Sequence, residues 1–233
     1  MPNFVQFLLT GNAKSTDKLA DTAKFLQGQL TANVAKITDT FLPTAICNLK
    51  GRVQFGLWLK QCENGYHIVL SSDLAEDFAN HVKKYGAFSK VELAEKYEIF
   101  PTVVDNFPTF STDIADKNVE DWQKISIEQG NYWLSKDSSE LFQPQELRLH
   151  QRGGVDYDKG CYLGQEIVAR LWFKASPKAW LHRVSLSNKL NEKVQIINQF
   201  NNQALVVARP NDLTSIEILP LPENLQRSVA REV

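Results

Sequence analysis

Two hydrophobic periods alternate along the first third of the chain, and each predicts a different kind of element. Residues 5–9 read as a strand, and a stripe at helical spacing follows in Leu19, Ala23, Leu26 and Leu30. Ser15 or Thr16 is expected to cap that helix. Residues 53–71 are expected to form a β-hairpin, because Asn64-Gly65 within them tolerates the positive φ angles that a tight turn demands.

A second helix is expected to begin at Ser72 or Asp73. Its apolar side repeats at helical spacing and is followed by a glycine that suits a left-handed C-terminal cap; the positions are Leu74, Phe78, Val82, Tyr85 and Gly86. Residues 90–100 then predict one strand or a pair of strands. Strands and helices mixed in this order indicate an α+β body.

Residues 101–120 break the pattern with two prolines and many polar positions, so we expect a connecting segment, followed by a short helix near residues 122–129. Four short strand candidates stand near the C-terminal end, at residues 181–187, 193–200, 203–210 and 214–221. Their spacing favours a small β-barrel or sandwich. The chain is therefore divided into an α+β body at residues 1–173, which can hold two interleaved subdomains, and a β-barrel-like part at residues 174–233.

Composition is that of an ordinary globular protein, since 43% of the 233 residues are hydrophobic and 23% are charged. A formal net charge of −1 argues against a general nucleic-acid coat protein. The N-terminal apolar run has no basic region before it and no small-residue cleavage site after it, so we read it as a strand and not as a signal peptide. No later stretch is long enough to span a bilayer, and no membrane partner is expected.

The three cysteines, Cys47, Cys62 and Cys161, form no CxxC pair and no cluster with the four histidines. Neither a disulfide framework nor a metal site is expected, and a reducing cytoplasm is the expected location. Cys47 and Cys62 stand in strand-like surroundings, where a free cysteine commonly fills space.

Cys161 differs from the other two cysteines in its surroundings. Leu163, Ile167 and Leu171 recur every four residues and predict a helix over residues 162–173, with Cys161 in its first turn. Unpaired N–H groups and the helix dipole at that position favour a thiolate.

The residues next to Cys161 add to this interpretation. Lys159 supplies a second positive influence, and Gly160 lets a ligand or another backbone approach closely. Cys161 is therefore a candidate functional thiol, and a cysteine that only fills space is the alternative. His150 is a weak candidate for a partner, because sequence cannot show whether the two side chains meet.

The region around Cys161 is basic although the chain as a whole is nearly neutral. Between residues 148 and 183, seven basic residues stand against three acidic ones, an excess of +4: Arg148, Arg152, Lys159, Arg170, Lys174, Lys178 and Arg183 against Asp156, Asp158 and Glu166. Such an excess suits an anionic ligand, such as a carboxylate-bearing cofactor, a phosphate or RNA. A solvated surface with basic side chains is the alternative.

The stretch KGCYLGQEIVAR, at residues 159–170, resembles the K-G-C-[FY]-x-G-Q-E signature of the folate-binding YgfZ proteins, a branch of the aminomethyltransferase (glycine-cleavage T-protein) superfamily. Other stretches resemble the same family in the same chain order: FLQGQLTANV at residues 25–34, LKGRV at 49–53, KKYGAFSKVEL at 83–93, ISIEQG at 125–130 and PQELRLHQRGGVDYDKGC at 144–161. The resemblance covers residues 25–173.

This resemblance implies a fold of three small domains around a central opening that can hold tetrahydrofolate. It implies ferredoxin-like α+β portions and a C-terminal small β-barrel. Only 28 residues separate Leu93 from Trp122, so the central region is expected to be reduced. The implied role is assembly or repair of iron–sulfur clusters, which affects the activity of enzymes that modify tRNA. The implied partners are folate and iron–sulfur assembly or client proteins, without direct binding of nucleic acid.

The resemblance also assigns residues. Cys161 is the signature thiol, and the cofactor-binding candidates beside it are Lys159, Gly160, Gln165, Glu166 and Arg170. Glu128 matches the acidic position that hydrogen-bonds the pterin ring, and a carboxylate facing the N–H donors of a pterin makes a strong paired contact. The basic excess fits the glutamate tail of a folate.

The chain also departs from the superfamily pattern. Phe55 and Gly56 stand where the aminomethyltransferases have a pair of aspartates, and neither can act as an acid or a base. Glycine-cleavage chemistry is therefore not expected. Asn33 stands where the family usually has Asp, and Arg148 where it often has Asn. Two alternatives stay open: a one-carbon transferase with a carboxylate from elsewhere, and a cofactor-free module that binds RNA or protein.

Overall fold

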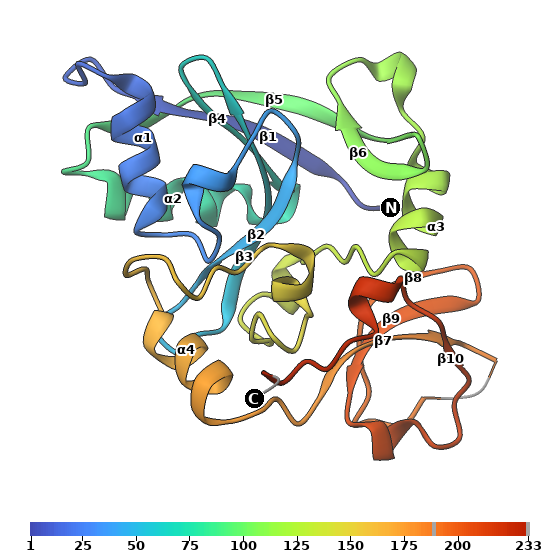
Figure 1. Ribbon diagram of the computed structural model, residues 1–233. Helices are drawn as coiled ribbons and strands as arrows, with labels where there is room; N and C mark the ends of the chain where they lie inside the picture. Colours follow the sequence, from blue (N-terminus) through green and yellow to red (C-terminus); the bar gives the residue numbers. More distant parts are fainter. Residues whose placement is uncertain (188–189, 232–233) are drawn as a thin grey trace.

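The computed structural model describes residues 1–187 and 190–231 and contains two antiparallel sheets (Figure 1). The larger sheet has the strand order β2-β3-β4-β1-β5-β6, and the smaller has the order β10-β7-β9-β8. The elements in chain order are β1 (Phe4–Gly11), α1 (Lys18–Gln27), β2 (Leu42–Cys47), β3 (Val53–Cys62), β4 (Gly65–Ser71), α2 (Ala75–Gly86), β5 (Val91–Val104), β6 (Phe107–Ser111), α3 (Val119–Glu128), α4 (Gln165–Lys174), β7 (Trp180–Ser185), β8 (Gln195–Phe200), β9 (Gln203–Ala208) and β10 (Ile218–Leu219).

The inner strands of the larger sheet have a ferredoxin-like topology. Apart from β2, which lies between α1 and β3 in the chain, the elements β1, α1, β3, β4, α2 and β5 follow one another as βαββαβ. Their strands lie side by side in the order β3-β4-β1-β5. Strands β2 and β6 extend this unit at its two edges. The predicted α+β class with a ferredoxin-like portion is confirmed.

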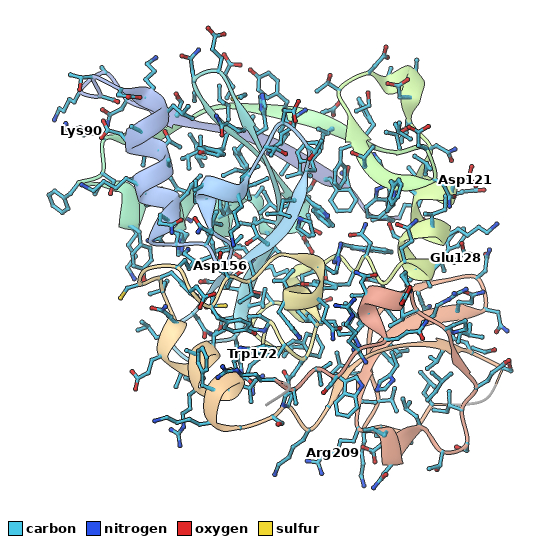
Figure 2. All side chains as sticks on the ribbon, in the orientation of Figure 1. Lys90, Asp121, Glu128, Asp156, Trp172 and Arg209 are labelled. Atoms are coloured by element: carbon cyan, nitrogen blue, oxygen red, sulfur yellow. The ribbon has the colours of Figure 1, made fainter. Side chains whose placement is uncertain are left out.

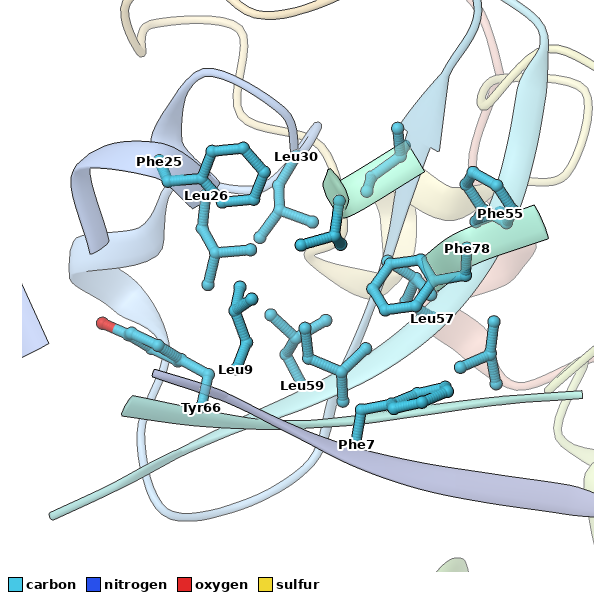
Figure 3. Packing of buried hydrophobic residues seen from close by; sticks show 14 of the residues in the cluster. Phe7, Leu9, Phe25, Leu26, Leu30, Phe55, Leu57, Leu59, Tyr66 and Phe78 are labelled. Carbon is cyan, nitrogen blue, oxygen red and sulfur yellow. The ribbon is translucent and has the colours of Figure 1, made fainter. Parts of the chain in front are cut away.

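Helices α1 and α2 pack on one face of this sheet. Alternate residues of β1 point to that face, and Phe7 and Leu9 lie there in one hydrophobic cluster (Figure 3). Leu26 and Leu30 from the predicted apolar stripe belong to the same cluster, as does Phe78 of α2. The two sequence periods therefore meet in a single core.

Aromatic side chains fill the opposite face of the sheet. The ring of Phe4 lies 5.7, 5.1 and 5.0 Å, between centroids, from the rings of Trp58, Phe110 and Trp122. Trp133 extends the cluster and lies 5.2 Å from Trp122. Trp122 belongs to α3, so α3 covers this face of the sheet.

Two predicted helix ends are wrong in detail. Asp17, not Ser15 or Thr16, caps α1, because its carboxylate accepts a hydrogen bond of 3.0 Å from an N–H in the first turn. Gly86 is the last residue of α2, and Ala87 after it has the backbone angles of a right-handed helix. The left-handed cap expected at Gly86 is therefore absent.

The hairpin expected over residues 53–71 is confirmed as β3 and β4. Cys62 pairs with Gly65, so the turn itself consists of Glu63 and Asn64. Gly65 opens β4 and lies close to β1: a Cβ atom on it would stand 2.1 Å from a backbone oxygen of that strand. Glycine is needed here for the close approach of two strands.

Residues 101–111 form a hairpin, and the connecting segment predicted there was wrong. Strand β5 continues to Val104 and pairs with β6. Asp105 and Asn106 between them have φ angles of 50° and 64°. Positive φ at both central positions is typical of a two-residue type I′ turn.

The two prolines that suggested a connection fit this hairpin because of their register. Pro101 pairs with Phe110, and Pro108 pairs with Val103. Val104 and Phe107 close the turn as a hydrogen-bonded pair, and hydrogen-bonded and non-hydrogen-bonded pairs alternate from there along the hairpin. Both proline pairs are non-hydrogen-bonded pairs, in which the N–H groups point away from the partner strand. A missing N–H therefore removes no hydrogen bond between β5 and β6.

All four C-terminal strand candidates are confirmed as β7 to β10. Their pairs run from β10 through β7 and β9 to β8, and among the described residues no pair joins β8 to β10, so the expected barrel is an open sheet. Leu181 and Leu205 from this sheet share a core with Leu147 and Leu149. The division after residue 173 falls one residue before the end of α4 and stays a prediction.

Candidate functional site

Three of the segments that resemble the YgfZ family meet at one place. The Thr31 hydroxyl donates to the Gly154 carbonyl oxygen at 2.6 Å, and the Asp156 N–H donates to the Thr31 carbonyl oxygen at 2.9 Å. Further along, the Leu163 N–H donates to the Gly28 carbonyl oxygen at 3.2 Å. The signature and the stretch before it are thus bonded to the segment that ends α1.

The Lys-Gly-Arg turn contacts the same signature through two glycines. Gly51 has a φ of 68°, and a Cβ atom on it would lie 2.8 Å from Cβ of Ile167. Gly164 has a φ of 79°, and a Cβ atom on it would lie 2.3 Å from the carbonyl oxygen of Asn48. Since both φ angles also favour glycine, each motif needs its glycine to contact the other.

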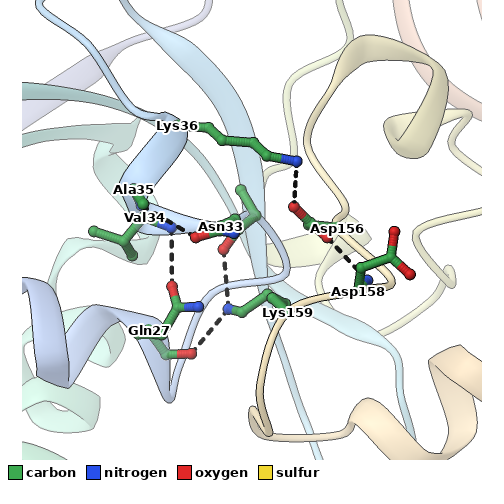
Figure 4. A network of polar contacts seen from close by, with 9 residues as sticks. Gln27, Asn33, Val34, Ala35, Lys36, Asp156, Asp158 and Lys159 are labelled. Atoms are coloured by element: carbon green, nitrogen blue, oxygen red, sulfur yellow. Dashed lines mark hydrogen bonds and ion pairs between the residues drawn. The ribbon is translucent and has the colours of Figure 1, made fainter.

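Lys159 is turned into the protein. Its ammonium donates to the carbonyl oxygens of Gln27, Leu30 and Ala32 at 2.8, 2.6 and 2.9 Å. Figure 4 shows the contact with Gln27. The residue is 7% exposed. Burial lowers the pKa of Lys159 to about 8, so the ammonium is still the main form at neutral pH. All three N–H donors are used within the protein, and none is left for the thiol or a ligand.

Cys161 lies on an exposed loop before α4 and is a free cysteine. The helix start predicted there was wrong: α4 begins at Gln165, after Gly164 in the left-handed conformation. The thiol therefore lies outside the first turn, and the helix dipole gives it no support. A functional role for Cys161 stays a prediction, now supported by accessibility and not by the helix.

The other signature residues lie around this loop. A Cβ atom on Gly160 would meet no atom within 4 Å, so space beside the loop is open. Gln165 and Glu166 begin α4, and Arg170 follows Glu166 by one turn. Glu166 and Arg170 are exposed and Gln165 is half-buried. The side chains of Glu166 and Arg170 are therefore accessible to a ligand, as is the thiol of Cys161.

Glu128 is not brought to this loop. It ends α3, next to the C-terminal sheet, where its carboxylate lies 4.0 Å from the guanidinium of Arg183 (Figure 2). An ion pair this long and partly exposed contributes at most about 1 kcal/mol. The pterin contact assigned to Glu128 stays a prediction.

The two β3 residues that replace the aminomethyltransferase aspartates point to opposite faces. Phe55 is fully buried in the core beneath α1 and α2. Gly56 faces the other side, where a Cβ atom would lie 3.3 Å from Cγ of Leu134. The cavity beside Gly56 measures about 10 Å³, whereas ligand pockets commonly measure about 300 to 1,000 Å³. The space beside Gly56 is therefore too small for a pterin ring.

A larger cavity of about 490 Å³ lies between α2 and residues 136–140. His81 and Tyr85 line one side of it, and Lys136 lines the other. None of the residues predicted to bind folate lines this cavity, and Cys161 does not line it either. The cavity therefore offers no support for a shared site of thiol and cofactor.

The remaining cysteines and His150 have structural surroundings. Cys47 is fully buried, and burial raises the pKa of its thiol, so its predicted space-filling role is confirmed. Cys62 is half-buried. His150 packs against the ring of Trp172 at 5.1 Å, and burial lowers its pKa to about 4. Across residues 1–187 and 190–231, no group of three His, Cys, Asp or Glu is placed to hold a metal ion.

Arg148 has a role that the sequence did not reveal. Its guanidinium donates to the carbonyl oxygens of Leu181 at 2.9 Å and Arg227 at 3.0 Å. Burial lowers the pKa of Arg148 to about 10, which leaves it charged at neutral pH. These partners lie 33 and 79 residues along the chain. Through these hydrogen bonds Arg148 links the C-terminal segment around Arg227 to the rest of the protein.

Comparison with curated proteins supports the resemblance seen in the signature. The chain is 27% identical to the tRNA-modifying protein YgfZ of Klebsiella pneumoniae (strain 342), over 71% of this chain and 66% of that protein. It is 29% identical to the tRNA-modifying protein YgfZ of Escherichia coli O127:H6, over 72% of this chain and 68% of that protein. The chain thus spans about two thirds of the length of these relatives. No protein-family model matches the chain.

Comparison with solved structures supports the fold. The crystal structure of the glycine cleavage system aminomethyltransferase T from Bartonella henselae matches 88% of this chain and 76% of that chain, with a TM-score of 0.63 and 8% sequence identity. At 8% sequence identity the match shows a similar fold and does not bear on function. The chain is therefore similar in sequence to the tRNA-modifying protein YgfZ of these bacteria, and its fold is similar to that of the Bartonella henselae aminomethyltransferase T.

Proposed function

We propose that this chain is an auxiliary protein of tRNA modification that assists the assembly or repair of iron–sulfur clusters, with Cys161 as its functional thiol. The relatives' name supports the link to tRNA modification. The observation that carries the role of Cys161 is the convergence of three signature segments, which leaves this one cysteine exposed on a loop. The iron–sulfur part rests on the family resemblance.

An exposed cysteine suits transient binding of iron or of a sulfur intermediate. The thiolate is the form that ligates iron, and the thiol releases its proton when the metal binds. A single cysteine cannot hold a [4Fe–4S] cluster, which takes four thiolates. We therefore propose that an assembly or client protein supplies the other ligands and that Cys161 contributes one of them during the encounter.

Tetrahydrofolate binding is the finer part of the proposal and rests on the fold and the resemblance. Glu128, Gln165, Glu166 and Arg170 are the residues proposed to bind it. The filled face beside Gly56 does not fit a pterin, so no step of the role proposed for Cys161 passes through folate.

The surroundings of Phe55 and Gly56 also bear on the two alternative functions, a one-carbon transferase and a cofactor-free interaction module. A one-carbon transferase needs a carboxylate beside the folate, and neither Phe55 nor Gly56 supplies one. A cofactor-free interaction module is the second candidate, because the filled face beside Gly56 favours a chain that works without a cofactor. Salt separates an RNA partner from a folate ligand, since affinity for RNA falls steeply with ionic strength.

We propose the cytoplasm as the place of action, since the free cysteines suit a reducing compartment. Within residues 1–187 and 190–231, no helix has the length and apolar character needed to cross a membrane.

Complementation tests the proposal. In bacteria that lack their own YgfZ-type protein, this chain is expected to restore the level of methylthiolated nucleosides in tRNA, measured by mass spectrometry. Cys161→Ser is expected to lose most of that effect, and Cys62→Ser, which changes another free and less exposed cysteine, is expected to keep it. Full restoration by Cys161→Ser would refute the thiol role and leave the interaction module.

A further inference from the structure

Gln27 is the last residue of helix α1, and its carbonyl has no N–H partner within the helix. The chain that follows the helix adds two more carbonyls, those of Leu30 and Ala32. The carbonyl oxygens of Gln27, Leu30 and Ala32 point at one position, and the ammonium of Lys159 occupies it at 2.8, 2.6 and 2.9 Å. A protonated lysine has three N–H donors and no acceptor, so it satisfies these three carbonyls at once. Its positive charge also suits the negative end of the helix dipole.

The ammonium is enclosed on its remaining side. The ring of Tyr162 lies 4.8 Å from Nζ, close enough for a cation–π contact. With 7% of Lys159 exposed, water has little access to replace the side chain. A second tie flanks this arrangement, since Lys36 and Asp156 form an ion pair of 2.7 Å (Figure 4).

We infer that Lys159 is a positioning residue: its ammonium ties the loop that carries Cys161 to the end of α1, and so fixes where the thiol is presented. We call Lys159 and the carbonyls of Gln27, Leu30 and Ala32 the Lys159 clamp. This role differs from the cofactor contact that the family resemblance assigns to the residue. The importance of the presented thiol rests on the proposed function, but the clamp itself does not.

The clamp accounts for why two distant motifs occur together. Lys159 belongs to the signature, whereas its three acceptors belong to the segment that resembles F-[LM]-Q-G-x-x-T, more than a hundred residues earlier. Two backbone bonds depend on the same docking, from the N–H groups of Asp156 and Leu163. The exchange rates of these two amides therefore report on the clamp directly.

The test is amide hydrogen exchange of the whole chain, compared for wild type, Lys159→Met and Lys36→Met. Methionine keeps the apolar stem of Lys159 and removes its donors. We expect the peptides with the Asp156 and Leu163 amides to exchange at least about tenfold faster in Lys159→Met, since the variant loses three hydrogen bonds of a charged group. Lys36→Met removes an ion pair whose lysine side chain is 71% exposed, and it is expected to change exchange less than about threefold.

Strand β4 separates a local effect from general destabilisation. Ile68 and Leu70 of this strand are fully buried in the core beneath α1 and α2, which includes no residue of the signature. We expect the β4 amides to stay protected in Lys159→Met while the amides of Asp156 and Leu163 lose protection. Unchanged exchange of the Asp156 and Leu163 amides, or β4 exchange that rises in step with theirs, would overturn the inference.

Chemical rescue keeps the test decisive if Lys159→Met does not fold. In Lys159→Ala, added propylammonium is expected to restore amide protection, because it brings three N–H donors to the vacated position. Tetramethylammonium carries the charge without donors and is expected not to do so. Failure of propylammonium, or equal rescue by both cations, would contradict the clamp. Cys161→Ser should keep wild-type exchange, which separates this inference from the proposed function.

Discussion

Gly164 lies so close to Asn48 that a Cβ atom on the glycine would stand 2.3 Å from the Asn48 carbonyl oxygen. With a φ of 79° as well, Gly164→Ala is expected to lower the free energy of unfolding by about 2 to 4 kcal/mol. Gly160→Ala is the matched control, because no atom lies within 4 Å of its Cβ position, and its cost is expected to stay below about 1 kcal/mol. Urea unfolding measures both, and equal losses would mean that the two motifs do not touch.

Acid is expected to destabilise the fold through buried histidines. Burial lowers the pKa of His150 and His182 to about 4, against about 6.5 in an unfolded chain. Between pH 6.5 and 4 the unfolded chain therefore binds more protons, so stability is present above pH 6.5 and is lost as the pH falls. Each histidine is expected to cost about 1 to 2 kcal/mol at pH 5 relative to pH 7.

A substitution checks this pH dependence. His150→Phe keeps a ring against Trp172 and removes two ring nitrogens that lack a hydrogen-bond partner in the described structure. Stability at pH 7 is expected to be unchanged or higher, and the loss between pH 7 and pH 5 is expected to be smaller than in wild type. If the variant lost the same stability on acidification, His150 would not be one of the responsible groups.

Arg148→Asn, which introduces the residue that the family often has, is expected to release the C-terminal segment. The change removes the donors to Leu181 and Arg227, and a lost buried hydrogen bond of a charged group costs about 1.5 to 3 kcal/mol. Limited proteolysis is expected to cut near residue 227 faster than in wild type. Gln151 also donates to Arg227, so Gln151→Ala serves as a milder comparison. Equal cleavage of Arg148→Asn and wild type would show that Gln151 suffices.

Much of the fold was predictable because it depends on local pattern. The stripe of α1 and the alternation of β3 and β4 each follow from neighbouring residues, and the four C-terminal strands do too. The hairpin at residues 101–111 does not follow from local pattern, because two prolines interrupt the strand-like sequence. Only the register shows that they sit where no hydrogen bond between β5 and β6 is lost.

The candidate site was less predictable, because its parts meet through contacts between distant residues. Leu163 continues the spacing of Ile167 and Leu171, yet its N–H bonds to Gly28, so the residue lies outside the helix. The acceptors of Lys159 lie 127 to 132 residues away in the sequence, and no local pattern predicts these contacts. The signature identified the right segment but not the direction in which its lysine points.

The most direct test of this account is the alkylation rate of Cys161 in the native protein, with and without tetrahydrofolate. Mass spectrometry follows the Cys161 peptide, and Cys161→Ser shows the background. We predict that Cys161 reacts readily while buried Cys47 does not. Saturating tetrahydrofolate is expected to slow the reaction, because three of the residues proposed to bind it, Gln165, Glu166 and Arg170, follow the Cys161 loop on α4. A Cys161 that resists alkylation without folate would contradict an exposed functional thiol, and a rate that tetrahydrofolate leaves unchanged would contradict folate binding beside the loop.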